Sequence, residues 1–472
     1  MQGAPPGSPD NPLRVAVIGS GPSGFYAVEH LQAQTDLTVQ VDLYDRLPTP
    51  FGLVRGGVAP DHQKIKSVTR IYDKIASNPE FRFFGNVEIG RDVVREELEA
   101  YYHGVIYAVG ARADRRMWIP NEHLPGSHSA TEFVGWYNAH PDFRRLRFNL
   151  DGEAAAVVGN GNVAMDVARI LASSPDDLSK TDISDDALEA LAESNIRTIH
   201  ILGRRGPAQA AFTNKEIREF GELPGVDVVV DPADLELDAA SAAWVQRAGD
   251  KTVERNLEIL RGYAERPLTG APKQVILHFA VSPVELLGAE RVTGMVVAHN
   301  ELHEAEDGSV RPRATDRRST IPVDLVFRAI GYLGEPLAGL PFDRRAGIIP
   351  NRAGRIIDPA TDEPMAGEYV CGWIKRGPQG VIGTNKPCAQ EAVECLLEDV
   401  RSGRIDRQVP PREVLERMLA ERQRDLVTYT DWQVLDALER ERGEADGGRP
   451  RIKFSRIEDM LAALSERRDA AV

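Results

Sequence analysis

The sequence predicts an α/β protein with two Rossmann-like domains, and three observations support this prediction. Two glycine-rich turns each lie between an apolar run typical of a strand and a run with helical periodicity. Two further apolar runs, residues 104–111 and 323–332, are typical of buried parallel strands. With 472 residues and 42% hydrophobic content, the chain has room for about three domains of roughly 150 residues.

The first glycine turn follows an apolar run at residues 13–18 and precedes a predicted helix at residues 25–31. Its glycines are Gly19, Gly21 and Gly24, in the GxGxxG spacing that lets a backbone approach a pyrophosphate at a helix N-terminus. A second predicted strand ends at Asp45, 21 residues after Gly24. This is the expected place for a carboxylate that binds a ribose hydroxyl. A glycine turn without a ligand is the alternative interpretation.

The second turn follows a predicted strand at residues 154–158 and opens a predicted helix at residues 162–171. Its pattern, Gly159-x-Gly161-x-x-Ala164, is a weaker signal than the first. A polar, acid-rich insertion follows at residues 173–195, with a short helix predicted at 185–193. Its composition predicts an excursion over the surface of the protein.

After the insertion, an apolar strand ends at Gly203 and is followed by Arg204 and Arg205. The position that normally carries an acid here carries two guanidinium groups, which suit a phosphate and not a ribose hydroxyl. The sequence therefore predicts recognition of the 2′-phosphate of NADP(H). An exposed structural pair of arginines is the alternative.

Composition excludes several classes of function. The formal net charge of −15 argues against general binding to nucleic acid or membrane, because both surfaces are anionic. The three cysteines form no CxxC pair, which disfavours a disulfide reductase and a zinc site and indicates a reducing compartment. The first twelve residues lack an apolar signal region, so we expect a short disordered lead and a cytoplasmic protein.

Several stretches together carry a specific resemblance. They are VIGSGPSGFYAVEHL, VDLYDRLPTPFGLVRGGVAPDH, VVGNGNVAMDVARIL, GRRGPAQAAFTNKEIRE and CGWIKRGPQGVIGTNKPCAQE. The sequence resembles the adrenodoxin reductase family of ferredoxin–NADP reductases, in its bacterial branch, from Leu13 to about Leu464. The resemblance implies a glutathione-reductase-like flavoprotein with FAD in the first domain and NADP(H) in the second. It also implies a ferredoxin-type iron–sulfur protein as electron partner.

The resemblance also implies which residues bind the cofactors and where the domains lie. For FAD it adds to Gly19, Gly21, Gly24 and Asp45 the following residues: Ser23, Leu53, Val87, Trp373, Gly380, Val381 and Ile382. For NADP(H) it indicates Asn160, Gly161, Asn162, Val163, Arg204, Arg205, Glu216 and Gly380. The FAD domain is expected at residues 1–112 and 325–472, and the NADP domain at 113–324. No catalytic residue is assigned, and no metal is expected.

Some features stay open between a functional and a structural interpretation. His62 and Glu219 suit proton handling or ring positioning, or a structural role alone. Two basic stretches are candidate ferredoxin surfaces or ordinary solvated faces: Lys66, Arg70 and Lys74 on one predicted helix, and Arg144, Arg145 and Arg147. An electron-input subunit of a larger enzyme and a non-enzymatic dinucleotide sensor are the rival functions.

Overall fold

A computed structural model of the chain describes residues 4–470, with the side chains of the last two of these left aside. The chain divides into two compact units. The first takes in the chain up to Val58, His62–Ala113 and the chain from Tyr332 onward, and the second takes in Ala59–Asp61 and Asp114–Gly331. No helix of the described residues is both long and apolar enough to cross a membrane.

The first unit is built on a seven-stranded sheet with the order β16-β17-β18-β4-β1-β2-β3. Its parallel part consists of β1 (Leu13–Ile18), β2 (Val39–Tyr44), β3 (Phe81–Phe84), β4 (Gly104–Tyr107) and β18 (Glu363–Val370). Short antiparallel strands complete one edge, β16 (Asn351–Arg352) and β17 (Arg355–Asp358). Both faces of β1 are buried: Val15 and Val17 belong to one apolar cluster, and Ala16 and Ile18 to another.

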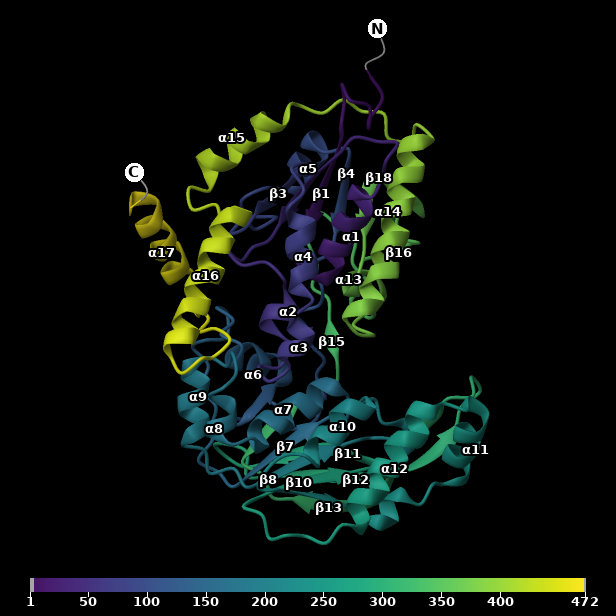
Figure 1. Cartoon of the computed structure of the whole chain (residues 1–472). Helices are drawn as coiled ribbons and strands as arrows, with labels where there is room; N and C mark the ends of the chain where they lie inside the picture. Colours follow the sequence, from purple (N-terminus) through teal and green to yellow (C-terminus); the bar gives the residue numbers. More distant parts are fainter. Residues whose placement is uncertain (1–3, 471–472) are drawn as a thin grey trace. The chain divides into compact units, whose positions relative to one another are not determined.

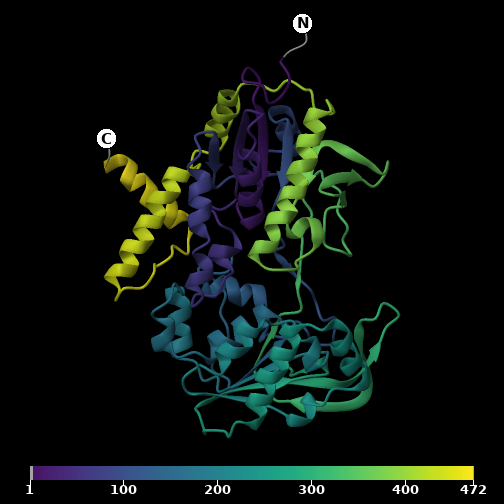
Figure 2. The ribbon, with the colours of Figure 1, turned by 45° about the vertical axis from the view of Figure 1, so that its right-hand side comes forward.

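Helix α1 (Pro22–Gln32) packs against α14 (Asn385–Arg401) beside this sheet, as Figures 1 and 2 both show. The remaining helices of the unit are α2 (Leu53–Gly56), α3 (Gln63–Lys66), α4 (Thr69–Ala76), α5 (Arg95–Tyr101), α13 (Trp373–Arg376), η3 (Ile382–Thr384), α15 (Arg412–Arg422), α16 (Tyr429–Ala445) and α17 (Ile457–Ala470). Trp432 and Leu435 of α16 enter the same apolar cluster as α1. Helix α16 therefore packs on this unit.

The second unit contains a six-stranded parallel sheet with the order β6-β14-β7-β8-β10-β9. Its strands are β6 (Ser127–Ser129), β7 (Ala154–Val158), β8 (Thr198–Leu202), β9 (Val226–Val230), β10 (Lys273–His278) and β14 (Leu325–Arg328). A separate antiparallel sheet consists of β11 (Val281–Leu287), β12 (Gly294–Glu304) and β13 (Val310–Ile321). Two short strands, β5 (Ala113–Asp114) and β15 (Tyr332–Leu333), pair where the chain passes between the units.

The helices of the second unit are α6 (Ala130–Tyr137), α7 (Asn162–Ala172), α8 (Pro175–Leu178), α9 (Asp185–Ala192), η1 (Pro207–Gln209), α10 (Asn214–Phe220), η2 (Pro232–Leu235), α11 (Ala239–Ala248) and α12 (Lys251–Glu265). The acid-rich insertion contains α8 and α9, so its predicted helix is present. The prediction of a surface excursion is wrong for part of it. Leu178, Ile183 and Leu191 are buried in the main apolar cluster of the unit, because they bring apolar faces to that core.

The first predicted basic stripe does not form. Helix α3 ends at Lys66 and α4 begins at Thr69, so the three cations do not share one continuous helix. Lys66 is buried, whereas Arg70 and Lys74 are exposed. The regular spacing predicted one helix because it carried no signal for the break at Ser67 and Val68.

Candidate functional site

The first glycine turn has the geometry of a loop that holds a pyrophosphate. Gly19 has a φ of +106°, a conformation that suits glycine. A Cβ at Gly24 would lie 2.0 Å from the carbonyl oxygen of Gly19, so α1 crosses the strand end at a distance that only glycine permits. At Gly21 the space where a Cβ would stand is open, and no side chain caps the N-terminus of α1. The helix N–H groups are thus left for an anionic ligand.

Asp45 is held in place from both sides of its carboxylate. Its Oδ2 accepts hydrogen bonds from the backbone N–H of Ser20, at 3.0 Å, and from the Ser20 hydroxyl. Its Oδ1 accepts from the N–H of Leu47 at 3.0 Å. The Val87 N–H donates to the Asp45 carbonyl at 2.9 Å, which brings two predicted FAD residues together. Ser20 was missed by the sequence analysis, although it stands between two of the predicted glycines.

Two distant segments meet this turn through close glycine contacts. A Cβ at Gly52 would lie 2.9 Å from the Cα of Gly21, so Leu53, which begins α2, lies near the turn. A Cβ at Gly372, φ +76°, would lie 2.1 Å from the Ser23 hydroxyl. Trp373 follows immediately and begins α13. The structure therefore gathers Gly21, Ser23, Leu53 and Trp373 around one place.

Polar groups around Ser23 suit a bound cofactor. The Ser23 hydroxyl donates to Oδ1 of Asn385 at 3.0 Å, and Arg376 donates to the same oxygen at 2.9 Å. The indole N–H of Trp373 is buried without a hydrogen-bond partner in the protein, and its ring stacks on Tyr332 at 5.5 Å. A buried donor without a partner fits a site completed by a ligand. Sequence analysis missed Arg376 and Asn385.

The loop at Gly380 lies close to these groups in the chain but is more exposed. Gly380 has a φ of +81°, and a Cβ there would lie 2.3 Å from the Thr384 hydroxyl. Val381 is 59% exposed, and Ile382 begins the turn η3. Because the apolar side chain of Val381 is exposed and its neighbour Gly380 is small, this loop leaves room for a planar ligand.

The second glycine turn repeats the first in the other unit. Gly159 has a φ of +129°, and its N–H donates to the Leu202 carbonyl at 2.9 Å. No side chain caps the N-terminus of α7 at Gly161, in contrast to α9, where Ser184 accepts from the Ala187 N–H. Val163 is partly buried against the main apolar cluster, so it serves packing as well.

The chain after Arg205 returns across this turn. The N–H of Ala211 donates to the Asn160 carbonyl at 3.1 Å, and the N–H of Thr213 donates to Oδ1 of Asn162 at 3.0 Å. The Asn160 amide nitrogen is buried and has no hydrogen-bond partner in the protein. That unused donor at a helix N-terminus fits a phosphate oxygen.

Arg204 and Arg205 stand directly after β8, next to this turn. A Cβ at Gly203 would lie 2.5 Å from the Asn160 amide nitrogen. The chain just before the two arginines therefore passes close to the glycine turn. The backbone of both is held: the Arg205 carbonyl accepts from Ala280 at 2.9 Å, and the Arg204 carbonyl accepts from Asn300 at 2.8 Å. Burial lowers the pKa of Arg205, and the neighbouring charge of Arg204 lowers it further. The two adjacent positive charges repel each other. A bound dianion would relieve this repulsion, so the pair favours one.

Glu216 lies on α10 and belongs to a buried ionic network centred on Arg169. Arg169 is 2% exposed and contacts Asp61 at 2.6 Å, Asp166 at 2.7 Å, Glu216 at 3.1 Å and Glu219 at 3.4 Å. Burial acts to lower the pKa of Arg169, but the hydrogen bond to Asp61 and the surrounding carboxylates raise it above the ordinary value. Arg169 thus joins α7 to α10 and orients Glu216. Sequence analysis did not identify it.

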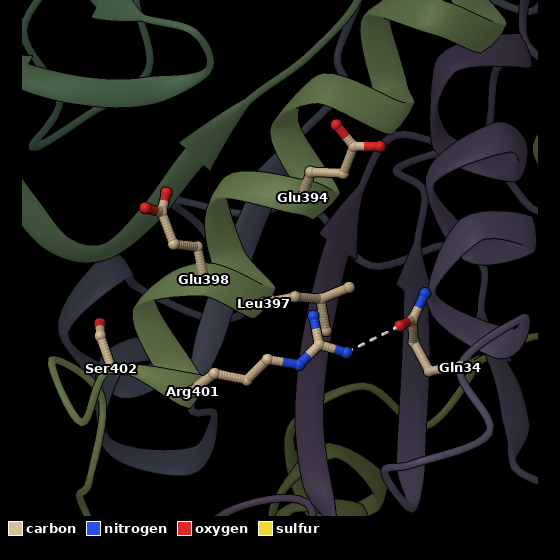
Figure 3. A pocket seen from close by; sticks show the side chains of 6 residues that line it. All are labelled: Gln34, Glu394, Leu397, Glu398, Arg401 and Ser402. Carbon is tan, nitrogen blue, oxygen red and sulfur yellow. Dashed lines mark hydrogen bonds between the residues drawn. The ribbon is translucent and has the colours of Figure 1, made fainter.

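A surface pocket of about 630 Å³ in the first unit is lined by none of the predicted cofactor residues (Figure 3). The guanidinium of Arg401 crosses it to Gln34, at 3.2 Å, and also pairs with Asp36 at 2.9 Å. The three cysteines, Cys371, Cys388 and Cys395, are buried free thiols. Burial raises the pKa of Cys371, so a nucleophilic role is disfavoured.

Comparisons with known proteins agree with the motifs. Residues 13–205 match the family model of pyridine nucleotide-disulphide oxidoreductases. NADPH-ferredoxin reductase FprA of Mycobacterium tuberculosis is 47% identical over 459 residues, which cover 95% of this chain and 98% of the relative. The mitochondrial NADPH:adrenodoxin oxidoreductase of Salvelinus fontinalis is 39% identical over 467 residues, covering 96% and 91%.

A solved structure shows that the likeness extends to the fold. The structure of Mycobacterium tuberculosis FprA in complex with NADPH has a TM-score of 0.91 and 47% identity, and covers 96% of this chain and 100% of that chain. Similarity of this extent confirms the two-domain α/β fold class that the sequence predicts. The chain therefore belongs to the NADPH-ferredoxin reductase family and is an oxidoreductase.

Proposed function

We propose that this protein is a ferredoxin–NADP reductase that passes electrons from NADPH through FAD to a ferredoxin-type iron–sulfur protein. The relatives named above are NADPH-ferredoxin and NADPH:adrenodoxin reductases. The observation that carries the proposal is the pair Arg204 and Arg205, placed beside an uncapped glycine turn in one unit while a second uncapped turn and Asp45 lie in the other. One site offers a carboxylate for a ribose hydroxyl, and the other offers two guanidiniums for a phosphate. The two sites therefore suit two different cofactors.

The first unit is the proposed FAD site. The FAD domain is proposed at residues 1–112 and 325–472, of which residues 325–331 lie in the second compact unit. Asp45 would accept from the ribose, and the N-terminus of α1 with Ser23 would face the pyrophosphate. Trp373, Gly380, Val381 and Ile382 would line the ring, with Leu53 and Val87 beside the rest of the cofactor. The open space at Gly21 and the unpartnered Trp373 N–H support this placement.

The second unit is the proposed NADP(H) site. The NADP domain is proposed at residues 113–324, and the compact unit extends beyond it to Gly331. The segment from Asn160 to Val163 would hold the pyrophosphate, and Arg204 and Arg205 would hold the 2′-phosphate. Glu216, fixed by Arg169, would also contact the cofactor. The buried, unpartnered Asn160 amide supports this placement.

The proposed reaction requires the protein to position the two cofactors, and it requires no nucleophile from the protein. When bound, FAD supplies an acceptor for hydride and a donor of single electrons. The protein's part is to bind both cofactors, fix their orientation and exclude water. His62 and Glu219 are proposed as positioning groups only. Buried free cysteines are consistent with the proposed cytoplasmic location.

Rapid-mixing absorbance spectroscopy tests the proposal. The purified protein should be yellow, should bleach with NADPH far faster than with NADH, and should then reduce an added ferredoxin. In a variant with Arg204→Ala and Arg205→Ala, loss of charge-assisted hydrogen bonds of about 1.5–3 kcal/mol should raise the KM for NADPH by about 10–100-fold. The KM for NADH should be unchanged.

Lys180→Ala is the matched control, because Lys180 is an exposed cation of the same unit, on the insertion. A protein that binds both nucleotides without reducing any acceptor would be a sensor and not a reductase. Equal rates with NADPH and NADH would contradict the assignment of the two arginines.

A further inference from the structure

A single tryptophan on the second unit is exposed in an unusual way. Trp118 is 79% exposed, whereas the other exposed large apolar side chains among the described residues reach 59% at most. Its neighbours Met117 and Ile119 are partly buried and pack against an apolar cluster. The loop is therefore anchored on both sides of Trp118, and the indole itself extends into solvent.

The backbone at Trp118 is strained. Its φ is +57°, in the left-handed region that large side chains avoid and that glycine and asparagine adopt readily. Such strain persists where the surrounding structure enforces it, and it is frequent at functional sites. Trp118 is thus held in a conformation that its own side chain disfavours.

A buried carboxylate enforces this conformation. Glu122 is 2% exposed, and its two oxygens accept the N–H groups of Met117 at 2.7 Å and of Trp118 at 3.0 Å. Arg328 lies 3.5 Å from the same carboxylate. The charge of Glu122 is therefore matched inside the protein, and its two oxygens fix two successive peptide groups.

One cation contacts the indole. The guanidinium of Arg116 lies 4.5 Å from the centroid of the Trp118 ring, in a cation–π contact, and also contacts His123 and, at 3.6 Å, Glu122. Arg115, the preceding residue, is exposed. We call residues 115–123 the Trp118 loop. It presents a rigid aromatic group with positive charge at its edge, on a chain whose formal net charge is −15.

We propose that the Trp118 loop is a docking contact for the acidic electron-carrier protein. Tryptophan and arginine are the residues that most often carry the binding energy of protein interfaces. An acidic partner meets repulsion from most of an anionic chain, so a local cationic patch directs where it binds. An ordered loop also loses little entropy when it binds. The inference rests on the proposed function, because it takes the partner class from there.

The test separates docking from electron transfer within the protein. Three quantities are measured on the FAD-loaded full chain: the rate of reduction of an acidic ferredoxin, the rate of reduction of ferricyanide, and the KM for NADPH. Trp118→Gly should raise the KM for ferredoxin by about 5–50-fold, the size of an interface hot spot. Ferricyanide reduction and the KM for NADPH should not change.

The same variant has a second signature. Because glycine accepts a positive φ, Trp118→Gly should keep or raise the Tm, by about 1–2 °C, while it weakens ferredoxin binding. Leu268→Gly is the control for loss of an exposed apolar group in this unit, since Leu268 is 57% exposed. It should leave the KM for ferredoxin unchanged.

Charge reversal tests the cationic part of the proposal. Arg115→Glu should raise the KM for ferredoxin by about 10-fold at low salt and flatten its salt dependence, whereas Lys180→Glu should do neither. Unchanged KM for ferredoxin in both Trp118→Gly and Arg115→Glu overturns the docking inference and leaves the reductase intact. A wild-type protein that reduces ferricyanide but no ferredoxin overturns the proposed function, and the docking inference with it.

Discussion

At the scale of single residues, charge placement is the basis of the NADP(H) site proposed for the second unit. Arg204 and Arg205 lie at a strand end where their carbonyls are held by Asn300 and Ala280, so their side chains are displayed on a fixed backbone. Two unmatched guanidiniums at this point favour a phosphate over a hydroxyl. The same unit also contains a polar pair that the proposed reaction does not use, His200 and His278.

A partly buried histidine pair predicts a loss of stability in acid. Nδ1 of His200 and Nε2 of His278 lie 2.9 Å apart on neighbouring strands. Burial, and then the charge of His278, lower the pKa of His200 to about 4, and burial together with His299 lowers that of His278. The unfolded chain takes up protons below about pH 6.5 while the folded pair does not. Stability should therefore be constant above pH 6.5 and fall between pH 6.5 and 4.

Thermal unfolding at pH 8 and pH 5 measures this effect. His200 alone should cost about 2 kcal/mol of stability at pH 5, at 1.36 kcal/mol per pKa unit below its ordinary pKa. In His200→Asn the difference in Tm between the two pH values should shrink. His303→Asn, at an exposed position of β12, should keep the wild-type difference. Equal pH dependence in wild type and His200→Asn would contradict the assignment.

At the scale of elements, each nucleotide turn works because a helix crosses a strand end closely. In the first unit, α1 approaches β1 so nearly that a Cβ at Gly24 would lie 2.0 Å from the Gly19 carbonyl oxygen. The N-terminus of α1 is thereby aimed at the turn without a side-chain cap. In the second unit, Gly159 is fixed by a hydrogen bond to Leu202 of β8.

Gly24→Ala should separate α1 from β1. The added methyl group meets backbone, which cannot rotate away, so we expect a loss of about 3 kcal/mol in the free energy of unfolding and weaker flavin retention. Urea titration and the flavin absorbance of the purified variant measure both. Gly262→Ala, in α12 with open space around it, is the control and should stabilise by up to about 1 kcal/mol. Full flavin retention in Gly24→Ala would contradict this account.

At the scale of the whole molecule, the two compact units should respond to different ligands. Each has its own parallel sheet, its own apolar core and one glycine turn. A ligand that binds only the folded state stabilises it by about 4 kcal/mol when present at a thousand times its Kd. Binding to one unit therefore protects that unit first.

Hydrogen exchange of the flavin-free protein with FAD or with NADP+ tests the domain assignment. FAD should slow exchange in α1 and α13 of the first unit, and NADP+ should slow exchange in α7 and in residues 204–213 of the second. NAD+ at the same concentration is the control and should protect the second unit less. Protection of α7 by FAD alone would contradict the proposed domains.

The local secondary structure around both glycine turns follows from short stretches of sequence. The turns at Gly19 and Gly159, the strands before them and the helices after them obey short-range periodicity and lie where the sequence predicts. Prediction from sequence failed where distant segments decide the outcome. The insertion after Ser173 is polar in composition, yet Ile183 enters the core, and Lys66 is buried in spite of its charge. Composition does not show which side chains of a segment pack against the rest of the protein.

The sequence by itself determined the two glycine turns, Asp45 and the arginine pair, because each stands at the end of an apolar run that short-range periodicity marks as a strand. Only the tertiary structure decided that Gly372 lies against Ser23, that Ser20 holds Asp45, and that Arg169 gathers carboxylates from α7, α10 and Asp61. It also showed that Glu122 holds Trp118 outward. These contacts join segments that the chain brings together only when the cores form, so no local pattern records them.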